Sequence, residues 1–488
     1  MSFNLISKNF YKFLLVSLFI LFGVLGLARS SWAVTYTICS SGCTATTFSG
    51  LFSAIDLEPD DVIEVQADTP GGSKTFIERV TPGSNDYGSA GHPLIIRVRA
   101  GDTIIIQGSG DTGYGSSGIY MVGAANGYIT FDGFNLTNYG YSGVRLSGNS
   151  AASKLPGITI KNCTATTSVI SVNTDTTQCY MASYTDGLVL ENNTCNIADQ
   201  VNNNQTDCFY FAGVSNTDIN GNLCNDQNAD GDGHNDGIQS QGGGGGSVPL
   251  GSTYNYTVRN NIFVHRGSHT DAKQLMYFEY ETGGNNYIYN NVAYALSGGG
   301  GGSQMISVAN KNNGTNGNFF VYNNTFRPTG NILAFVTDVY SPNITFKNNI
   351  VYSEQPNSGG TISIANTAGS SASNNLYYNI NGSSEQWFRW GTTYYTFNQW
   401  NTNVEGGTAV WGDPLFISTS FYPYDLQVLS GSPAIDAGAD ISGAFVVDKV
   451  GTSRPQGSAW DIGAYEYAAA SPPPDTTPPA APSGVTVS

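Results

Sequence analysis

Short apolar runs bounded by asparagine and glycine recur along the chain. An apolar residue, a variable residue and an asparagine pair return about every 30 residues, a period typical of solenoid proteins. Full copies are Leu190–Asn193, Val258–Asn261, Ile288–Asn291, Val321–Asn324 and Phe346–Asn349, and looser copies are Ile160–Asn162, Ile219–Asn222 and Ser373–Asn375. Repetition of this kind predicts one elongated core built from stacked units.

Each repeat also carries a second short run that has the character of a β-strand. Examples are Cys208–Phe211, Gly237–Ser240, Leu275–Phe278 and Ile332–Phe335. These runs are apolar or alternating, and none reaches the length of a helix. Two or three such strands per unit, with each coil stacked on the one before, predict an all-β, single-stranded right-handed parallel β-helix.

The asparagine pair has a physical role in such a coil. Asparagine tolerates the left-handed backbone angles of a tight bend, and stacked side-chain amides can bond to their counterparts in the coils above and below. The apolar residue two places before the first asparagine is expected to fill the interior.

Composition supports strands over helices and excludes one class of partner. The chain contains 60 glycines, and only 11% of its residues are charged, so amphipathic helices with charged faces are few. The formal net charge is −17, and no basic stripe is present to neutralise phosphates. Nucleic acid is therefore not an expected partner.

The N-terminus is typical of a secretory signal peptide. Lys8 and Lys12 precede an apolar run at Phe13–Leu27, and small residues in Ser31–Ala33 suit a signal peptidase. We expect a signal peptide over residues 1–33 and a secreted protein, extracellular or on the cell surface. The alternative is a membrane anchor, but the apolar run is short for a span, and no later segment is long and apolar enough to cross a membrane.

Seven cysteines follow the predicted cleavage site. In an oxidising compartment, stacked positions favour disulfides between Cys179 and Cys208 and between Cys195 and Cys224, since each pair is separated by one coil. A third pair, Cys39 with Cys43, would close a short loop, and Cys163 is left over and buried. The alternative is that the stacked cysteines pack in reduced form.

Several passages resemble the pectate-lyase-like β-helix superfamily. The N-terminal cap and first coils of that superfamily resemble Phe48–Ile55, Pro59–Val65, Gly91–Arg97 and Tyr128–Phe134, and the closing segment of many secreted bacterial members resembles Asp413–Phe416, Ser432–Gly438 and Asp461–Tyr467. The resemblance implies a capped β-helix over residues 34–380 and a closing segment over 381–467. A Pro-rich linker (468–482) and the start of a truncated fibronectin-type-III-like module (483–488) are expected to follow.

Ionisable residues concentrate in three consecutive repeats. The members singled out are Asp207, Asp230, Asp232, His234, Asp236, His265, Arg266 and Lys273. If Phe209, Ile238 and Leu275 share one interior column, then Asp207, Asp236 and Lys273 start neighbouring strands, about 4.8 Å apart. Asp271 is the alternative to Lys273, because the loop lengths leave the alignment open by two residues.

Such a cluster suits β-elimination from a uronic acid polymer. Asp207, Asp230, Asp232 and Asp236 would bind Ca²⁺, a hard cation that prefers oxygen ligands. Lys273 would be the base, with His234, His265 and Arg266 beside it. The pattern is similar to polysaccharide lyase family nine, which uses clustered aspartates and a lysine on neighbouring coils. Asn235 and Gln239 depart from that family, which tends to have further aspartates there.

Several alternatives remain open at this stage. A glycoside hydrolase could use Asp207 and Asp236 as its paired carboxylates, and a non-catalytic adhesin could bind glycan on the same scaffold. The aspartates could also lie in solvated turns or hold a structural ion. The expected partner is an acidic polysaccharide, and the expected state is a monomer. The late aromatic cluster, from Trp387 to Trp411, is expected to pack a capping segment on the final coil.

Overall fold

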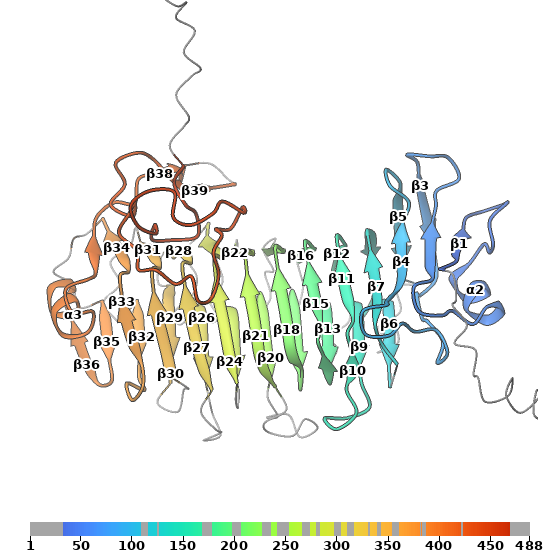
Figure 1. The fold of residues 1–488 in the computed structure, drawn as a ribbon, viewed down its shortest axis with the longest axis horizontal. Helices are drawn as coiled ribbons and strands as arrows, with labels where there is room; N and C mark the ends of the chain where they lie inside the picture. Colours follow the sequence, from blue (N-terminus) through green and yellow to red (C-terminus); the bar gives the residue numbers. More distant parts are fainter. Residues whose placement is uncertain are drawn as a thin grey trace, which may run out of the picture.

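The structure is a computed structural model. It describes residues 33–108, 116–123, 126–167, 178–197, 206–226, 236–241, 253–265, 274–279, 284–296, 304–309, 317–329, 332–338, 343–353, 361–380, 382, 387–420 and 423–468. The predicted signal peptide falls almost entirely outside these residues, as do the linker and the fibronectin-like start. Figure 1 shows the coils stacked along one axis, with helix α2 at one end and helix α3 at the other.

Three long parallel sheets, here called A, B and C, form the walls of the coil within the described residues. Sheet A contains β1 (Thr35–Ile38), β2 (Val62–Val65), β4 (Leu94–Val98), β7 (Ile129–Asp132), β11 (Thr159–Lys161), β15 (Val189–Glu191), β18 (Ser215–Asn220), β21 (Tyr254–Arg259), β24 (Asn285–Tyr289), β27 (Asn318–Tyr322), β30 (Asn343–Lys347) and β33 (Ser371–Ser373), with β10 (Leu155–Pro156) and β14 (Thr185–Asp186) beside this path. Sheet B contains β3 (Ser73–Phe76), β5 (Thr103–Gln107), β8 (Phe134–Thr137), β12 (Thr164–Thr166), β16 (Thr194–Ile197), β19 (Leu223–Asp226), β22 (Ile262–His265), β25 (Val292–Ala295), β28 (Thr325–Arg327), β31 (Ile350–Ser353), β34 (Leu376–Asn379) and β37 (Val410–Trp411).

Sheet C contains β6 (Ser117–Val122), β9 (Ser142–Ser147), β13 (Gln178–Ser183), β17 (Phe209–Ala212), β20 (Ile238–Gln241), β23 (Gln274–Glu279), β26 (Gln304–Ala309), β29 (Leu333–Thr337), β32 (Ile362–Ile364), β35 (Phe388–Trp390) and the antiparallel strand β36 (Thr393–Tyr395). Each strand pairs with the corresponding strand of the next coil, as when Val258 pairs with Ile288. The predicted all-β parallel β-helix is therefore confirmed, and the second run of each repeat corresponds to a strand of sheet C.

The asparagine pairs form the bend between sheets A and B. The first asparagine of a pair has a positive φ, for example 54° at Asn290 and 48° at Asn323. The second is buried and continues a hydrogen-bonded ladder from coil to coil. Asn324 Nδ2 donates to the Ile288 carbonyl (2.8 Å) and to Asn349 Oδ1 (3.0 Å). The roles predicted for the asparagines are confirmed, and the apolar residue two places before them is buried, as at Val321.

The ladder ends on a buried carboxylate, Glu405. Its oxygens accept hydrogen bonds from the Asn375 backbone N–H (3.3 Å) and Nδ2 (3.2 Å), from Tyr377 Oη (2.7 Å) and from Trp400 Nε1 (2.7 Å). Burial raises the pKa of the Glu405 carboxyl, although these hydrogen bonds oppose the shift. A carboxylate, which only accepts hydrogen bonds, is suited to this position, because Asn375 presents donors and the next strand, β37, is not preceded by a further asparagine that could accept them.

Short helices close both ends of the β-helix. Helix α2 (Phe48–Ala54) buries Phe48 and Leu51 against the first coils, and its N-cap Thr47 accepts a hydrogen bond from the Gly50 N–H. Helix α3 (Phe397–Asn403) buries Trp400, which stacks on Phe388 at 4.9 Å. The expected N-terminal cap and the expected packing role of the late aromatic cluster are both observed.

Two of the three disulfides link sheet C to sheet B. Cys39 pairs with Cys43 as predicted, but Cys179 pairs with Cys195 and Cys208 pairs with Cys224. The predicted bridges between coils are wrong, although Cys195 and Cys224 do lie in register. Side chains that stack in register point in the same direction, whereas residues on two adjoining walls face each other. Cys163 is free and buried, as expected.

A closing segment folds back over the outer face of sheet B (Figure 1). The closing segment starts after Trp411 and not at residue 381, where the sequence analysis placed its start. The reason is that β37 still pairs with β34 in the last coil. It includes the antiparallel strands β38 (Phe416–Ser418) and β39 (Asp425–Val428). Leu426 and Ala464 pack against Val264 and Val292 of the coil wall. None of the helices in the described part of the chain has the length and apolar character needed to cross a membrane.

Candidate functional site

The register of sheet C decides which predicted site residues are neighbours. Phe209 of β17 pairs with Ile238 of β20, which pairs with Met276 of β23. Gln274, two residues before Met276, therefore occupies the position equivalent to Asp236 and Asp207. The predicted alignment through Leu275 is wrong by one residue, because the connections between the coils differ in length and the sequence period does not determine them.

Asp207 and Asp236 form a second ladder, at the start of the sheet C strands. Asp207 Oδ1 accepts the N–H of Asp236 at 2.9 Å, and Asp236 Oδ1 accepts the N–H of Gln274 at 2.9 Å. Both side chains are at most 1% exposed. One oxygen of each carboxylate is thus engaged in joining a coil to the next, and neither side chain lies on an open surface.

Of the six other residues predicted for the site, the structure describes one, and five lie outside the described residues. His265 ends β22 and is buried. Lys273, His234, Arg266, Asp230 and Asp232 lie outside the described residues. Within the described part of the chain, no group of three His, Cys, Asp or Glu residues is arranged to hold a metal ion. The predicted calcium site and the lysine base therefore remain predictions.

The topology brings the ends of two relevant segments together. Segment 227–235 runs from β19 to β20, and segment 266–273 runs from β22 to β23. Because β19 pairs with β22 and β20 pairs with β23, both ends of the first segment lie one coil from those of the second. The strand ends that flank the two segments therefore lie at one edge of the β-helix, between sheets B and C.

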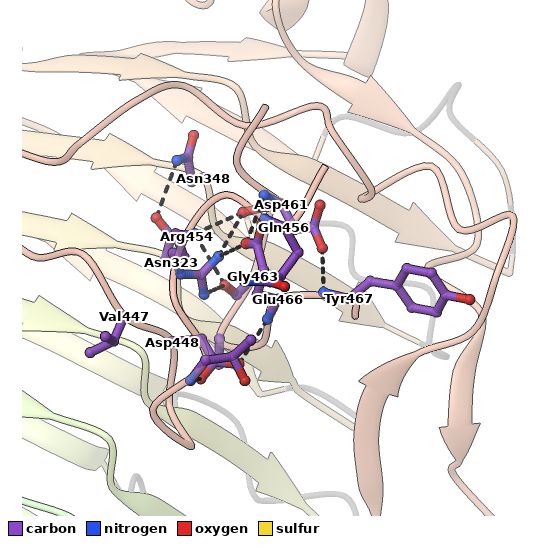
Figure 2. Close-up of polar contacts among 12 residues, drawn as sticks. Asn323, Asn348, Val447, Asp448, Arg454, Gln456, Asp461, Gly463, Glu466 and Tyr467 are labelled. Atoms are coloured by element: carbon purple, nitrogen blue, oxygen red, sulfur yellow. Dashed lines mark hydrogen bonds and ion pairs between the residues drawn. The ribbon is translucent and has the colours of Figure 1, made fainter. Parts of the chain in front are cut away.

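A second group of charged residues, which the sequence interpretation did not single out, belongs to the closing segment itself (Figure 2). Arg454 and Glu466 form an ion pair of 2.8 Å in which neither side chain is exposed. Arg454 also donates to the carbonyls of Asp461 (3.2 Å) and Gly463 (2.9 Å). Asp448 accepts the N–H of Glu466 at 3.0 Å.

The same group attaches the closing segment to the asparagine bends. Asn323 Nδ2 donates to the carbonyls of Asp461 (2.9 Å) and Gly463 (3.1 Å), and Asn348 Nδ2 donates to that of Ala439 (2.8 Å). Lys449 Nζ donates to the carbonyl of Asn260, and burial lowers the pKa of this lysine to about 8. All of these contacts are between parts of the protein itself. We therefore interpret this group as a clamp that holds the closing segment on the coil. The sequence feature that could have indicated this group is the passage Asp461–Tyr467, which resembles the closing segment of secreted bacterial β-helix proteins.

Three parallel sheets, an N-terminal capping helix and a closing segment place the chain in the class of capped parallel β-helix proteins. No protein-family model matches the sequence, and no curated protein matches it significantly.

Solved structures with a similar course of the chain include pectate lyase Pel9A (16% identity, 89% of this chain and 97% of that chain, TM-score 0.44). A complex of XylC with xylose is similar at 10% identity, 89% and 99% coverage and a TM-score of 0.42. A Yersinia enterocolitica family 28 exopolygalacturonase is similar at 14% identity, 72% coverage of both chains and a TM-score of 0.33.

Proposed function

We propose that this is an exported β-helix protein that acts on polysaccharide, and more specifically a calcium-assisted lyase of a uronic acid polymer. The observation that supports the site is the pairing of β19 with β22 and of β20 with β23, because these strands flank segments 227–235 and 266–273. Export is supported by the three disulfides, because such bonds persist in oxidising compartments.

The proposed reaction needs a base beside the sugar. The proton next to a uronate carboxylate is weakly acidic, and its removal becomes easier when the carboxylate charge is neutralised. Lys273 is the proposed base: it takes this proton, and the C–H electron pair forms a new C=C bond. The glycosidic C–O bond breaks with its electrons on the leaving sugar oxygen, which takes a proton from water. His234, His265 and Arg266 are proposed to bind and orient the sugar around that point.

Calcium is a separate part of the proposal. The ion would neutralise the substrate carboxylate, and it would offset the repulsion between a polyanion and a protein of net charge −17. The described residues do not form a complete ligand set, and Asp207 and Asp236 each have one oxygen bonded to a backbone N–H. The proposed set therefore also requires Asp230 and Asp232.

The proposal is tested by incubating the protein with pectate, alginate and related uronic polymers, with and without a chelator. Unsaturated products are expected to raise ultraviolet absorbance, and the chelator is expected to prevent this. Lys273→Ala should abolish the reaction. Lys161→Ala is the control, since Lys161 pairs with Asp132 (3.3 Å) on the distant outer face of sheet A.

Three results would contradict the lyase proposal. The first is no absorbance with any of the polymers, and the second is equal loss in both lysine variants. The third is release of reducing ends without absorbance, which indicates hydrolysis. Paired action of Asp207 and Asp236 is not favoured for a hydrolase, because both carboxylates are buried. Binding without cleavage would indicate the adhesin alternative.

A further inference from the structure

The outer face of sheet A contains a groove that is separate from the edge between sheets B and C. It has a volume of about 350 Å³ and is formed by three consecutive strands, β18, β21 and β24. Its lining includes Asn216, Asp218, Asn255, Thr257, Asn285 and Tyr287. The lining residues all carry a polar group, and Tyr287 contributes the one aromatic ring.

The groove exists because a small residue lies between two large ones. Asp218, Thr257, Tyr287 and Phe320 are in register on four neighbouring strands, which are spaced by about 4.8 Å. Phe320 stacks on Tyr287 with ring centroids 4.8 Å apart and planes inclined by 22°. One face of the Tyr287 ring is therefore covered. The opposite face looks toward Thr257, whose side chain is too small to cover it.

The wall opposite Tyr287 is a fixed carboxylate. Asp218 accepts two hydrogen bonds from the guanidinium of Arg259, one from Nε (3.0 Å) and one from a terminal nitrogen (2.8 Å). This bidentate geometry holds the carboxylate oxygens in place and neutralises their charge. The Asp218–Arg259 pair thus carries no net charge, although the protein as a whole is acidic.

A row of amides runs along one end of the groove. Asn255 Nδ2 donates to Asn216 Oδ1 (2.9 Å), and Asn255 Oδ1 accepts the N–H of Asn285 (3.1 Å). The row continues when Asn318 Nδ2 donates to Asn285 Oδ1 at 2.9 Å. Consecutive amides therefore present donors and acceptors at the spacing of the coils, beside the exposed ring face.

We infer that this groove binds a neutral polysaccharide chain. A sugar ring has an apolar face that suits the uncovered face of Tyr287 and hydroxyls that suit the amides and the Asp218 carboxylate. A polyanion is disfavoured, because the groove has no net positive charge and the protein carries −17. This binding does not depend on the proposed lyase reaction.

The sharpest test fills the groove without disturbing the core. Thr257 is half-buried on the outer face, where an aromatic residue is well tolerated in a strand. Thr257→Tyr should continue the stack of Tyr287 and Phe320 and occupy the sugar position. The matched control is Thr159→Tyr, in the same outward column two coils before Asp218. Tyr287→Ala is a second variant, which removes the aromatic wall.

Affinity electrophoresis in native gels containing xylan, glucomannan or mixed-linkage β-glucan measures the binding. The wild-type protein and Thr159→Tyr should be retarded equally by at least one of these polymers, whereas Thr257→Tyr and Tyr287→Ala should bind about tenfold more weakly or not at all. Circular dichroism checks that each variant is folded.

The inference is overturned if no neutral polymer retards the wild-type protein, or if polygalacturonate alone does. It is also overturned if Thr257→Tyr is retarded as strongly as Thr159→Tyr. Failure here would leave the lyase proposal intact, because that proposal concerns a different face and is measured by product absorbance.

Discussion

Replacing one asparagine of the inner ladder should destabilise the protein far more than replacing one on the surface. In Asn324→Ala, the N–H of Asn291 loses its acceptor (3.0 Å) and the carbonyl of Ile288 loses a donor (2.8 Å). The contacts with the neighbouring amides of Asn291 and Asn349, both 3.0 Å, are also lost. All of these groups are buried, so water cannot replace the missing partner.

The expected cost follows from the groups left unsatisfied. A buried polar group without a partner costs about 1–3 kcal/mol, and at least the Asn291 N–H and one amide are affected, so we expect a loss of about 3 kcal/mol. Asn285→Ala is the control. Asn285 belongs to the outer amide row and is exposed, so its loss should cost under about 0.5 kcal/mol.

The measurement is urea-induced unfolding of both variants and the wild-type protein. Far-ultraviolet circular dichroism and tryptophan fluorescence should give coincident transitions, which is required before free energies are compared. If Asn324→Ala destabilises the protein no more than Asn285→Ala does, the inner ladder contributes nothing beyond its bend geometry, and the reasoning is refuted.

Three further predictions concern the clamp and the disulfides. Burial lowers the pKa of Lys449 to about 8, so above that pH the folded protein binds fewer protons than the unfolded chain does. The free energy of unfolding of the wild-type protein should therefore rise by about 1.5 kcal/mol between about pH 8 and 9.5. Denaturation curves should show that Lys449→Met removes this rise. Arg454→Met leaves the Glu466 carboxylate buried and unpaired, and thermal and urea denaturation should show a loss of about 3–5 kcal/mol that Glu466→Gln in the same chain partly restores. Peptide mapping without reduction should join Cys179 to Cys195, and a bridge from Cys179 to Cys208 would contradict the structure.

The sequence alone determined the features that every coil repeats. The asparagine pairs predicted both the left-handed bend, seen at Asn290 and Asn323, and the buried ladder through Asn291 and Asn324. This was possible because the same local interaction recurs at each turn, so any one copy suffices to interpret the others. The stacked strands were predicted for the same reason, whereas the cap at residues 48–54 was predicted from a resemblance to the N-terminal cap of a known superfamily.

Only the tertiary structure decided what depends on register between coils and on contacts across the coil. The connection before β23 places Gln274, and not Lys273, in line with Asp236. The cysteines stack as predicted but bond across a corner, because the direction of a side chain matters as much as its distance. The groove beside Thr257 arises from three residues on three coils, and the Arg454 clamp from segments far apart in the chain. Neither arrangement recurs from coil to coil, so the repeat in the sequence could not predict it.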